Sequence, residues 1–236
     1  MENPLTSIAA LEEYSNHFWS SWKDGYGRKD YNFCLALSEE FINAVKPIYR
    51  DRVYGESSEA SDGYAFAYVF LMLSKGLEDI VQLASLTKGG IWTHNNLKTQ
   101  DVWDKLCDAK ERLAVFNDHY TNRAIIEVLN KQLDGLEASF YEIFGQGLYM
   151  SPVILVKKAV CTICGSNIKA CSHIPGNLYN GKCCKENVVD FTLDGADIVQ
   201  SPHDMRCRIW PWNFTDEMTF TGRLFSLKRL DEFIDT

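Results

Sequence analysis

The sequence predicts an α+β protein, in which an antiparallel helical bundle is followed by a small, zinc-stapled and partly β module. Three observations lead to this prediction. Apolar residues recur at helical spacing through residues 7–144, five cysteines and a histidine gather within residues 161–184, and shorter alternating runs follow. Ser151-Pro152 marks the expected boundary between the bundle, residues 1–150, and the module, residues 151–236.

Five helices are expected in the bundle, separated by short loops that contain glycine or polar residues. The third, at about residues 63–87, is apolar on nearly every side, which is typical of a helix in the middle of a bundle. Because the connections are short, neighbouring helices should run antiparallel. The other four are expected at about residues 7–23, 30–48, 99–116 and 120–144.

The cysteine-rich stretch, which begins with Cys161-Thr-Ile-Cys164, has the spacing of a metal site. A C-x2-C pair brings two thiolates to one ion from a tight turn, and Gly165 lets the backbone turn beneath it. Thiolate-rich sites favour zinc, with an iron–sulfur cluster as the alternative. Four ligands close the coordination sphere, so the zinc is expected to be structural. The predicted ligands are Cys161, Cys164, Cys171 and His173, with Cys183 and Cys184 as alternates.

Composition and charge limit the classes of function. The formal net charge of the 236-residue chain is −8, which opposes nonspecific binding of nucleic acid by the whole surface. The longest apolar run, residues 65–73, is too short to cross a bilayer, so no membrane partner is expected. Residues 1–4 do not resemble the start of a secretory signal. We therefore expect a cytoplasmic protein with reduced thiols, which disfavours disulfides in the cysteine-rich stretch.

Positive charge is concentrated around the cysteines, because residues 157–185 contain five lysines and no acidic residue. In one interpretation the lysines offset the negative thiolates. In the other they form a basic contact surface for RNA, DNA or an acidic protein, and nearby arginines and tryptophans on one side of a strand extend it. The tryptophans could instead belong to the core. The residues of this predicted surface are Lys157, Lys158, Lys169, Lys182, Arg206, Arg208, Trp210 and Trp212. These patterns favour a zinc-stabilised binding protein.

The rest of the module is expected to be rich in strands. Asp194-Gly195 fits a primed two-residue turn, which predicts a hairpin across residues 188–199. Residues 206–214 and 218–227 are predicted strands, and a short final helix follows them. Residues 153–156 are apolar, so we expect them to pack on the bundle and to anchor the module there.

Arg112 and His119 lie seven residues apart, so both point to one side if a single helix runs through them. With the helical first half, this pair resembles the R-x4-6-H motif of the HEPN family, although Leu113 stands where the family has a polar residue. The resemblance implies a homodimer with the pair in its seam, and metal-independent endoribonuclease activity in a toxin or antiviral defence protein. The histidine would then act as acid or base, and the arginine would stabilise phosphate charge. This resemblance is the one feature of the sequence from which we expect an enzymatic activity.

Overall fold

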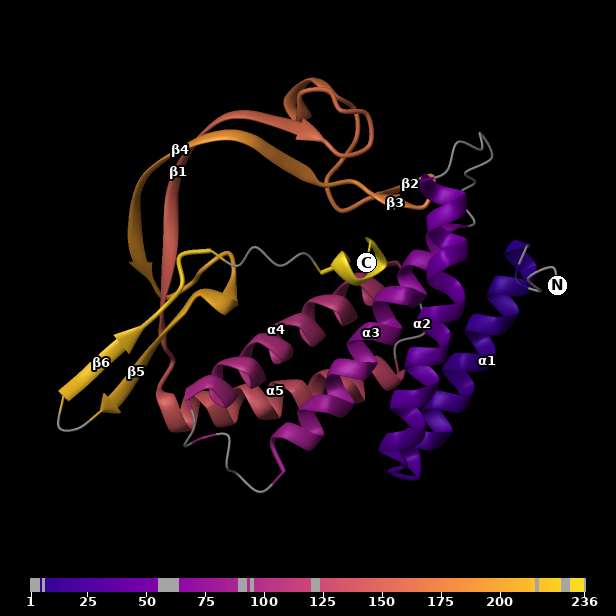
Figure 1. The fold of residues 1–236 in the computed structure, drawn as a ribbon, viewed down its shortest axis with the longest axis horizontal. Coiled ribbons are helices and arrows are strands. Elements are labelled where there is room, and N and C mark those ends of the chain that lie inside the picture. Colours follow the sequence, from indigo (N-terminus) through magenta and orange to yellow (C-terminus); the bar gives the residue numbers. More distant parts are fainter. Residues whose placement is uncertain are drawn as a thin grey trace.

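The structure is a computed structural model, and it describes residues 5, 7–54, 64–88, 93, 96–119, 124–214, 217–225 and 230–235. It confirms the predicted α+β class, since a helical half comes first and a region of antiparallel strands follows (Figure 1). Within the described residues, no helix combines the length and the apolarity needed to cross a membrane.

The five predicted helices are all present, and three of them run longer than predicted. They are α1 (Ile8–Gly27), α2 (Tyr31–Tyr54), α3 (Tyr64–Leu86), α4 (Asn96–His119) and α5 (Ala124–Phe144). The Ser7 side chain caps α1 by accepting a hydrogen bond from the Ala10 backbone N–H, 3.2 Å away. This bond satisfies one of the donors that a helix leaves unpaired in its first turn.

The third helix lies in the middle of the bundle, as predicted, because it packs against α2 and α4 and also meets α1. Its successive residues Phe70, Leu71 and Met72 are all buried. Consecutive side chains on a helix point about 100° apart, so their common burial means that neighbours cover α3 on several sides. The core continues through Phe116 of α4, which contacts both Phe70 and Trp19.

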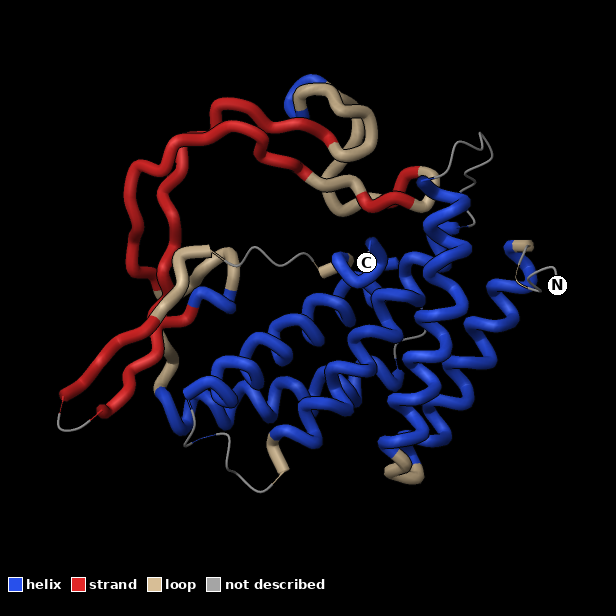
Figure 2. The backbone as a smooth tube through the Cα atoms, viewed as in Figure 1, coloured by secondary structure: helices blue, strands red, loops and turns tan. Residues whose placement is uncertain are grey.

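The strand region begins with a long two-stranded ribbon, formed by β1 (Leu148–Cys161) and β4 (Glu186–Val199). These strands pair antiparallel along their length, and the sheet order is β4-β1-β5-β6. The hairpin of β5 (Arg208–Phe214) and β6 (Glu217–Thr221) joins β1 at its first two residues. Figure 2 shows the ribbon leaving the bundle near the end of α5, arching away from it, and returning toward the end of α2.

Asp194-Gly195 does not form the predicted hairpin turn, because β4 continues straight through it. Val153 pairs with Gly195 and Ile154 pairs with Leu193, so Asp194 has no partner residue on β1. This arrangement is a β-bulge, in which one strand carries an extra residue. Glycine next to a short polar residue is common both in primed turns and in bulges, so the pair alone did not distinguish them.

The prediction that residues 153–156 pack on the bundle is also wrong. All four apolar side chains are exposed, Leu155 to 65% of its maximum. They lie in the middle of the ribbon, where β1 pairs with β4 rather than with a helix. An apolar run shows that a segment can be buried, but it does not show which neighbour covers it.

Buried side chains of the strand region fix the base of the ribbon to the bundle. The Arg208 guanidinium donates to the Gly145 carbonyl at 2.5 Å, just after the end of α5. It therefore satisfies an acceptor where a helix end exposes carbonyl groups and where a positive charge suits the helix dipole. Trp103 of α4 packs edge-on against Trp210 and donates from its indole N–H to the Met205 carbonyl at 2.7 Å.

Short elements complete the described chain. They are the 3-10 helices η2 (Ile168–Ala170) and η3 (Met205–Cys207), the strands β2 (Leu178–Tyr179) and β3 (Lys182–Cys183), and the helix α6 (Glu232–Asp235). The strand predicted over residues 218–227 is shorter than expected, since β6 ends at Thr221. The short final helix is present as α6.

Candidate metal centre

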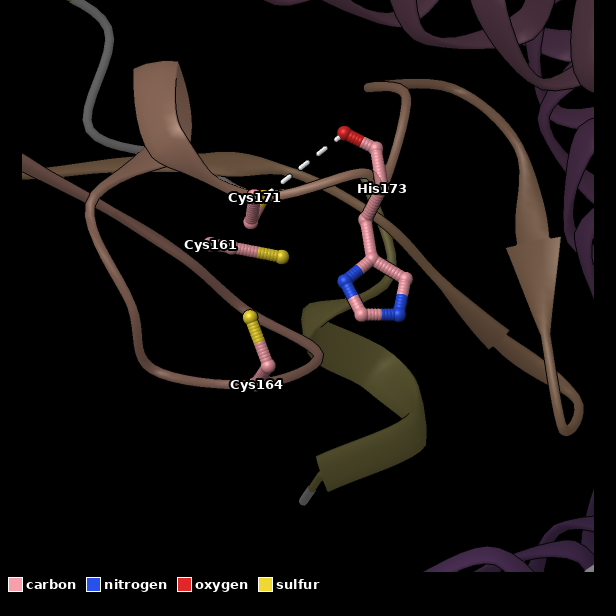
Figure 3. A group of neighbouring side chains, drawn as sticks. All are labelled: Cys161, Cys164, Cys171 and His173. Carbon is pink, nitrogen blue, oxygen red and sulfur yellow. Dashed lines mark hydrogen bonds between the residues drawn. The ribbon is translucent and has the colours of Figure 1, made fainter.

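The ribbon strands converge on the cysteine-rich stretch, because β1 ends at Cys161 and β4 begins just after Cys184. The predicted ligand atoms of Cys161, Cys164, Cys171 and His173 all lie within 4.8 Å of one another (Figure 3). The prediction that these four side chains gather is therefore confirmed. Three sulfurs and one imidazole at this spacing could hold a single metal ion.

The first cysteine pair sits on a tight turn that the backbone builds. Gly165 has φ = +71°, a conformation that is unfavourable for residues with a side chain, and its N–H donates to the Cys161 carbonyl at 2.8 Å. The Cys161 N–H donates in return to the Ser166 carbonyl at 2.8 Å. The Cys161 sulfur accepts from the Ile163 N–H at 3.3 Å, so the turn directs a backbone dipole at this sulfur.

The His173 imidazole lies beside the sulfur atoms of the first pair (Figure 3). Its Nδ1 atom is buried and lacks a hydrogen-bond partner in the part of the chain that the structure describes. The Tyr179 ring meets the imidazole edge-on, with 4.6 Å between centroids, and the Tyr179 hydroxyl accepts from the Ile174 N–H at 2.9 Å. A buried ring nitrogen without a partner is costly unless something binds it, so Nδ1 fits the role of a metal ligand.

Local dipoles favour thiolates at the first pair. Burial works to raise the pKa of Cys161, but hydrogen bonds from the backbone N–H groups of Cys164 and Ile163, together with those from the Cys184 and Cys164 thiols, outweigh it and bring that pKa to about 7. The Ser166 backbone N–H likewise lowers the pKa of Cys164. Burial, together with the neighbouring sulfurs, raises the pKa of Cys171. A bound cation would turn the repulsion between the sulfurs into attraction, so the cluster suits a metal better than free thiols.

The two alternate cysteines differ in where their sulfurs lie. The Cys184 sulfur is fully buried and 3.7 Å from that of Cys161. Two thiolates on one tetrahedral zinc ion, each about 2.3 Å from the metal, are roughly 3.8 Å apart, so Cys184 stays an alternate ligand. The Cys183 thiol instead donates to the carbonyl groups of Gly176 and Cys184, at 3.9 and 3.8 Å, and the residue packs against the bundle core.

The turn between β2 and β3 docks the metal loop on the bundle. Asn180 and Gly181 have φ values of +49° and +76°, and they connect the paired residues Tyr179 and Lys182. Two positive φ values in a two-residue loop identify a type I′ turn, for which Asn-Gly is the preferred pair. The Tyr49 hydroxyl of α2 donates to the Gly181 carbonyl at 2.6 Å. The Asn-Gly pair was the sequence signal that could have predicted this hairpin.

The basic and aromatic surface predicted from the sequence is not one surface. Arg206, Arg208 and Trp210 are buried, so their assignment to a binding surface is wrong. The Arg206 guanidinium donates to the carboxylates of Asp108 and Glu111 on α4, both at 2.8 Å. Alternation does put Arg208 and Trp210 on one side of β5, but that side faces the core. The Trp212 side chain lies outside the described residues.

The lysines of the predicted surface remain at the surface. Lys157, Lys158 and Lys169 are exposed, and Lys182 is half-buried. Lys185 is held by the Asp231 carboxylate, with 2.5 Å between nitrogen and oxygen. Positive charge therefore remains gathered near the metal end of the ribbon, but Trp210 and the two arginines do not contribute to it.

Arg112 and His119 both lie on α4, in different surroundings. The Arg112 guanidinium is buried, forms an ion pair with Asp79 of α3, and donates to the Leu230 carbonyl at 3.1 and 3.2 Å. His119, the last residue of α4, is exposed. The arginine thus links α3 and α4 to the C-terminal segment. The catalytic pair and the endoribonuclease activity implied by the HEPN resemblance stay a prediction.

Comparisons with protein-family models, with curated proteins and with solved structures find no match for this chain. A function must therefore be argued from the residues themselves. The features that can carry such an argument are the metal centre, the lysines around it, and the exposed ribbon that ends there.

Proposed function

We propose that this protein is a zinc-stapled binding protein, in which the bundle is the support and the ribbon with its metal loop is the contact element. The observation that carries the proposal is that the ribbon is held at both ends while its middle is exposed. Buried Arg208 and Trp210 fix the base, and Gly181 fixes the far end to α2. Most side chains of β1 and β4 between these points are exposed. A braced and exposed segment is suited to contact another molecule.

Zinc is the metal that this ligand set favours, because three thiolates and an imidazole suit a structural zinc site. The ion would join the end of β1 to the loop that precedes β4, and so it would brace the free end of the ribbon. Native mass spectrometry should find about one zinc per chain. Cys164→Ser should lose the metal, whereas Cys183→Ser should keep it, because the Cys183 sulfur points elsewhere.

An acidic protein surface is the partner that the charges favour over nucleic acid. Lys157, Lys158 and Lys169 present positive charge at the metal end of the ribbon. Stacking on aromatic rings is a main source of affinity for single-stranded nucleic acid, and the Trp210 ring is buried.

Fluorescence anisotropy with a labelled poly-glutamate peptide and a labelled single-stranded RNA of similar length tests this choice. At low ionic strength the peptide should bind more tightly than the RNA. The triple variant Lys157→Glu, Lys158→Glu, Lys169→Glu should weaken peptide binding by at least about tenfold. The matched control changes three exposed lysines of the bundle to glutamate: Lys29, Lys88 and Lys131. The control changes the net charge by the same amount but leaves the lysines at the metal end unchanged, so it should retain most of the binding.

Tighter binding of the RNA than of the peptide would overturn the choice of an acidic protein partner. An equal loss in the two triple variants would show that only net charge matters, and it would remove the metal end of the ribbon from the proposal. Absence of binding to both probes at low salt would contradict the proposal as a whole.

A further inference from the structure

The register of the ribbon divides its side chains between two faces that differ in chemistry. Paired residues of antiparallel strands lie on the same face, and successive residues alternate between faces. One face carries four successive apolar pairs, and we call it the apolar face. Its pairs are Met150–Ile198, Pro152–Ala196, Ile154–Leu193 and Val156–Phe191.

The bulge at Asp194 keeps the apolar face continuous. In a regular ladder Asp194 would stand opposite Ile154, and Leu193 would move to the other face beside Leu155. Because Asp194 is left out of the pairing, Leu193 and Phe191 stay on the apolar face. The residue that breaks the ladder thus preserves a surface that the protein leaves uncovered, which suggests a use for that surface.

Five large side chains of the apolar face are exposed, from 37% for Ile154 to 66% for Ile198. Soluble proteins rarely leave a continuous apolar patch of this kind without a partner. A ribbon of two strands is also marginally stable by itself, so covering one face would stabilise it.

The two ends of the apolar face differ, with a hollow at one end and an exposed aromatic ring at the other. A hollow of about 660 Å³ lies at the base, lined by the Met150–Ile198 pair and by residues that include Leu148 and Ile209. Leu148 pairs with Ile209, and alternation places this pair on the same face. At the other end the Phe191 ring is 47% exposed. One end therefore offers an aromatic side chain, and the other offers an apolar hollow.

We propose that the apolar face binds the apolar face of a second copy of this chain, antiparallel across a two-fold axis. A two-fold axis near the middle of the four pairs sets the Val156–Phe191 pair of each copy over the Met150–Ile198 pair of the other. Each Phe191 ring then enters the hollow of the opposite copy. The proposal rests on the ribbon being the contact element, but it uses a different surface from the lysines.

The β4 edge of the ribbon is a less suitable place for two copies to meet than the apolar face. β4 is the outermost strand of the described sheet, and it carries four acidic residues and no basic one. Antiparallel pairing of two such edges would bring four carboxylates from each copy into one seam, with no basic side chain of β4 to offset them. Charged residues on an outer strand are a usual protection against edge pairing, so the β4 edge is not the site of association that we propose.

The area of the apolar face is sufficient for a weak dimer. A half-exposed apolar side chain offers on the order of 80 Å², so five of them offer about 400 Å² per copy and about 800 Å² in a symmetric pair. Met150, Pro152 and the walls of the hollow add to this area. The total therefore comes close to the ~1,000 Å² that specific interfaces need.

Sedimentation velocity of the metal-loaded full chain over a wide concentration range tests the dimer. Ile198→Asn should raise the dimer dissociation constant by at least about tenfold, because it places a polar amide in the buried seam. Leu155→Asn is the matched control: Leu155 is 65% exposed, almost as much as Ile198, but it lies on the opposite face. Phe191→Ala should weaken the dimer similarly to Ile198→Asn.

A wild-type protein that stays monomeric at about 100 µM, tenfold above a weak dissociation constant of 10 µM, would overturn the dimer. Equal effects of Leu155→Asn and Ile198→Asn would overturn the assignment of the face. The poly-glutamate measurement on the same samples separates the two proposals. Peptide binding by a strictly monomeric protein would reject the dimer and leave the proposed function standing.

Discussion

The bundle and the ribbon belong to one chain but hold their shapes by different means. The bundle buries large apolar and aromatic side chains around α3, so its stability comes from area removed from water. The ribbon buries little in its middle, and contacts at its two ends fix it. At the base these are buried Arg208 and Trp210, and at the far end they are the thiol cluster and the Tyr49–Gly181 hydrogen bond.

This difference implies that each region should be able to lose its structure while the other stays folded. A change at the metal should loosen the ribbon and leave the bundle intact, while a change in the core should do the reverse. It also implies that the middle of the ribbon is available for contacts, because the part of the ribbon that joins the core lies at its base, where Tyr149 is buried.

The largest effect is expected from removal of the metal. Cys164→Ser should release the ion, and amide exchange in the metal loop and the adjoining half of the ribbon should become faster by on the order of 10,000-fold or more, since structural zinc supplies much of the folding free energy of small modules. Exchange in α3 should not change. Hydrogen exchange followed by mass spectrometry measures both regions in one experiment.

The control for this prediction is Cys34→Ser, which changes a buried cysteine of α2 that is far from the cluster in sequence and absent from the ligand set. It should keep the metal and the slow exchange of the ribbon. Faster exchange throughout α3 in Cys164→Ser would contradict the separation of the two regions.

The next largest effect is expected from Arg112→Ala, in the bundle. The change removes the buried ion-pair partner of the Asp79 carboxylate and leaves only Lys105, 3.6 Å away, which should cost about 3 kcal/mol of unfolding free energy. Lys110→Ala on the same helix is the control, because Lys110 forms partly exposed ion pairs with Asp134 and Glu137 that should contribute about 0–1 kcal/mol. Urea unfolding followed by circular dichroism gives both values, and equal losses would contradict the buried role of Arg112.

The same variant should change the pH dependence of stability. Burial raises the pKa of Asp79, and the positive charge of Arg112 works against this, so its removal should raise that pKa further. A carboxyl whose pKa is higher in the folded state stabilises the fold when protonated, and this stability is lost as the pH rises above the unfolded value. The destabilisation relative to the wild type should therefore be smaller at about pH 5 than at about pH 8, as urea midpoints can measure.

The bundle and the cluster of three cysteines and one histidine could be predicted because their signals are local. Helical periodicity located all five helices, and the spacing from Cys161 to His173 located the four side chains that gather. The partner of a strand face is not a local property. Arg208 and Trp210 alternate as a contact surface would, yet they face the core, because α4 and the end of α5 provide the aromatic rings and carbonyl groups that cover them.

The Asn-Gly pair and the Asp-Gly pair also show that a local pattern does not identify the partner of a segment. Asn180-Gly181 forms a type I′ turn, whereas Asp194-Gly195 lies in a bulge of a continuous strand. The difference depends on the flanking segments. Residues 182–183 turn back on residues 178–179, while residues 186–199 find a single long partner in β1, and no short window of the sequence contains that partner.

A smaller effect is expected from Gly181→Ala, which should loosen the far end of the ribbon. At φ = +76° an alanine costs about 1–2 kcal/mol, and a new Cβ would lie 3.1 Å from the Val53 side chain and 3.2 Å from the Tyr64 backbone, so crowding adds to the strain. Gly145→Ala is the matched control, because its φ is +74° and its Cβ would meet no atom within 4 Å. Exchange in residues 174–186 should rise in Gly181→Ala alone, and an equal rise in both would contradict docking through Gly181.

The smallest effect, and one of opposite sign, is expected from Gly195→Ala. Gly195 is not among the glycines with positive φ, and a Cβ built on it would meet no atom within 4 Å. Alanine in such a position restricts the unfolded chain without straining the folded one, so the variant should be unchanged or more stable by up to about 1 kcal/mol. A primed turn would instead need a positive φ at this residue, and alanine would then cost about 1–2 kcal/mol. Comparing the exchange rates of residues 190–198 between the variant and the wild type measures the sign directly. Slower or unchanged exchange agrees with a bulge in a continuous strand. Faster exchange would instead favour the hairpin turn that the Asp-Gly pair predicted.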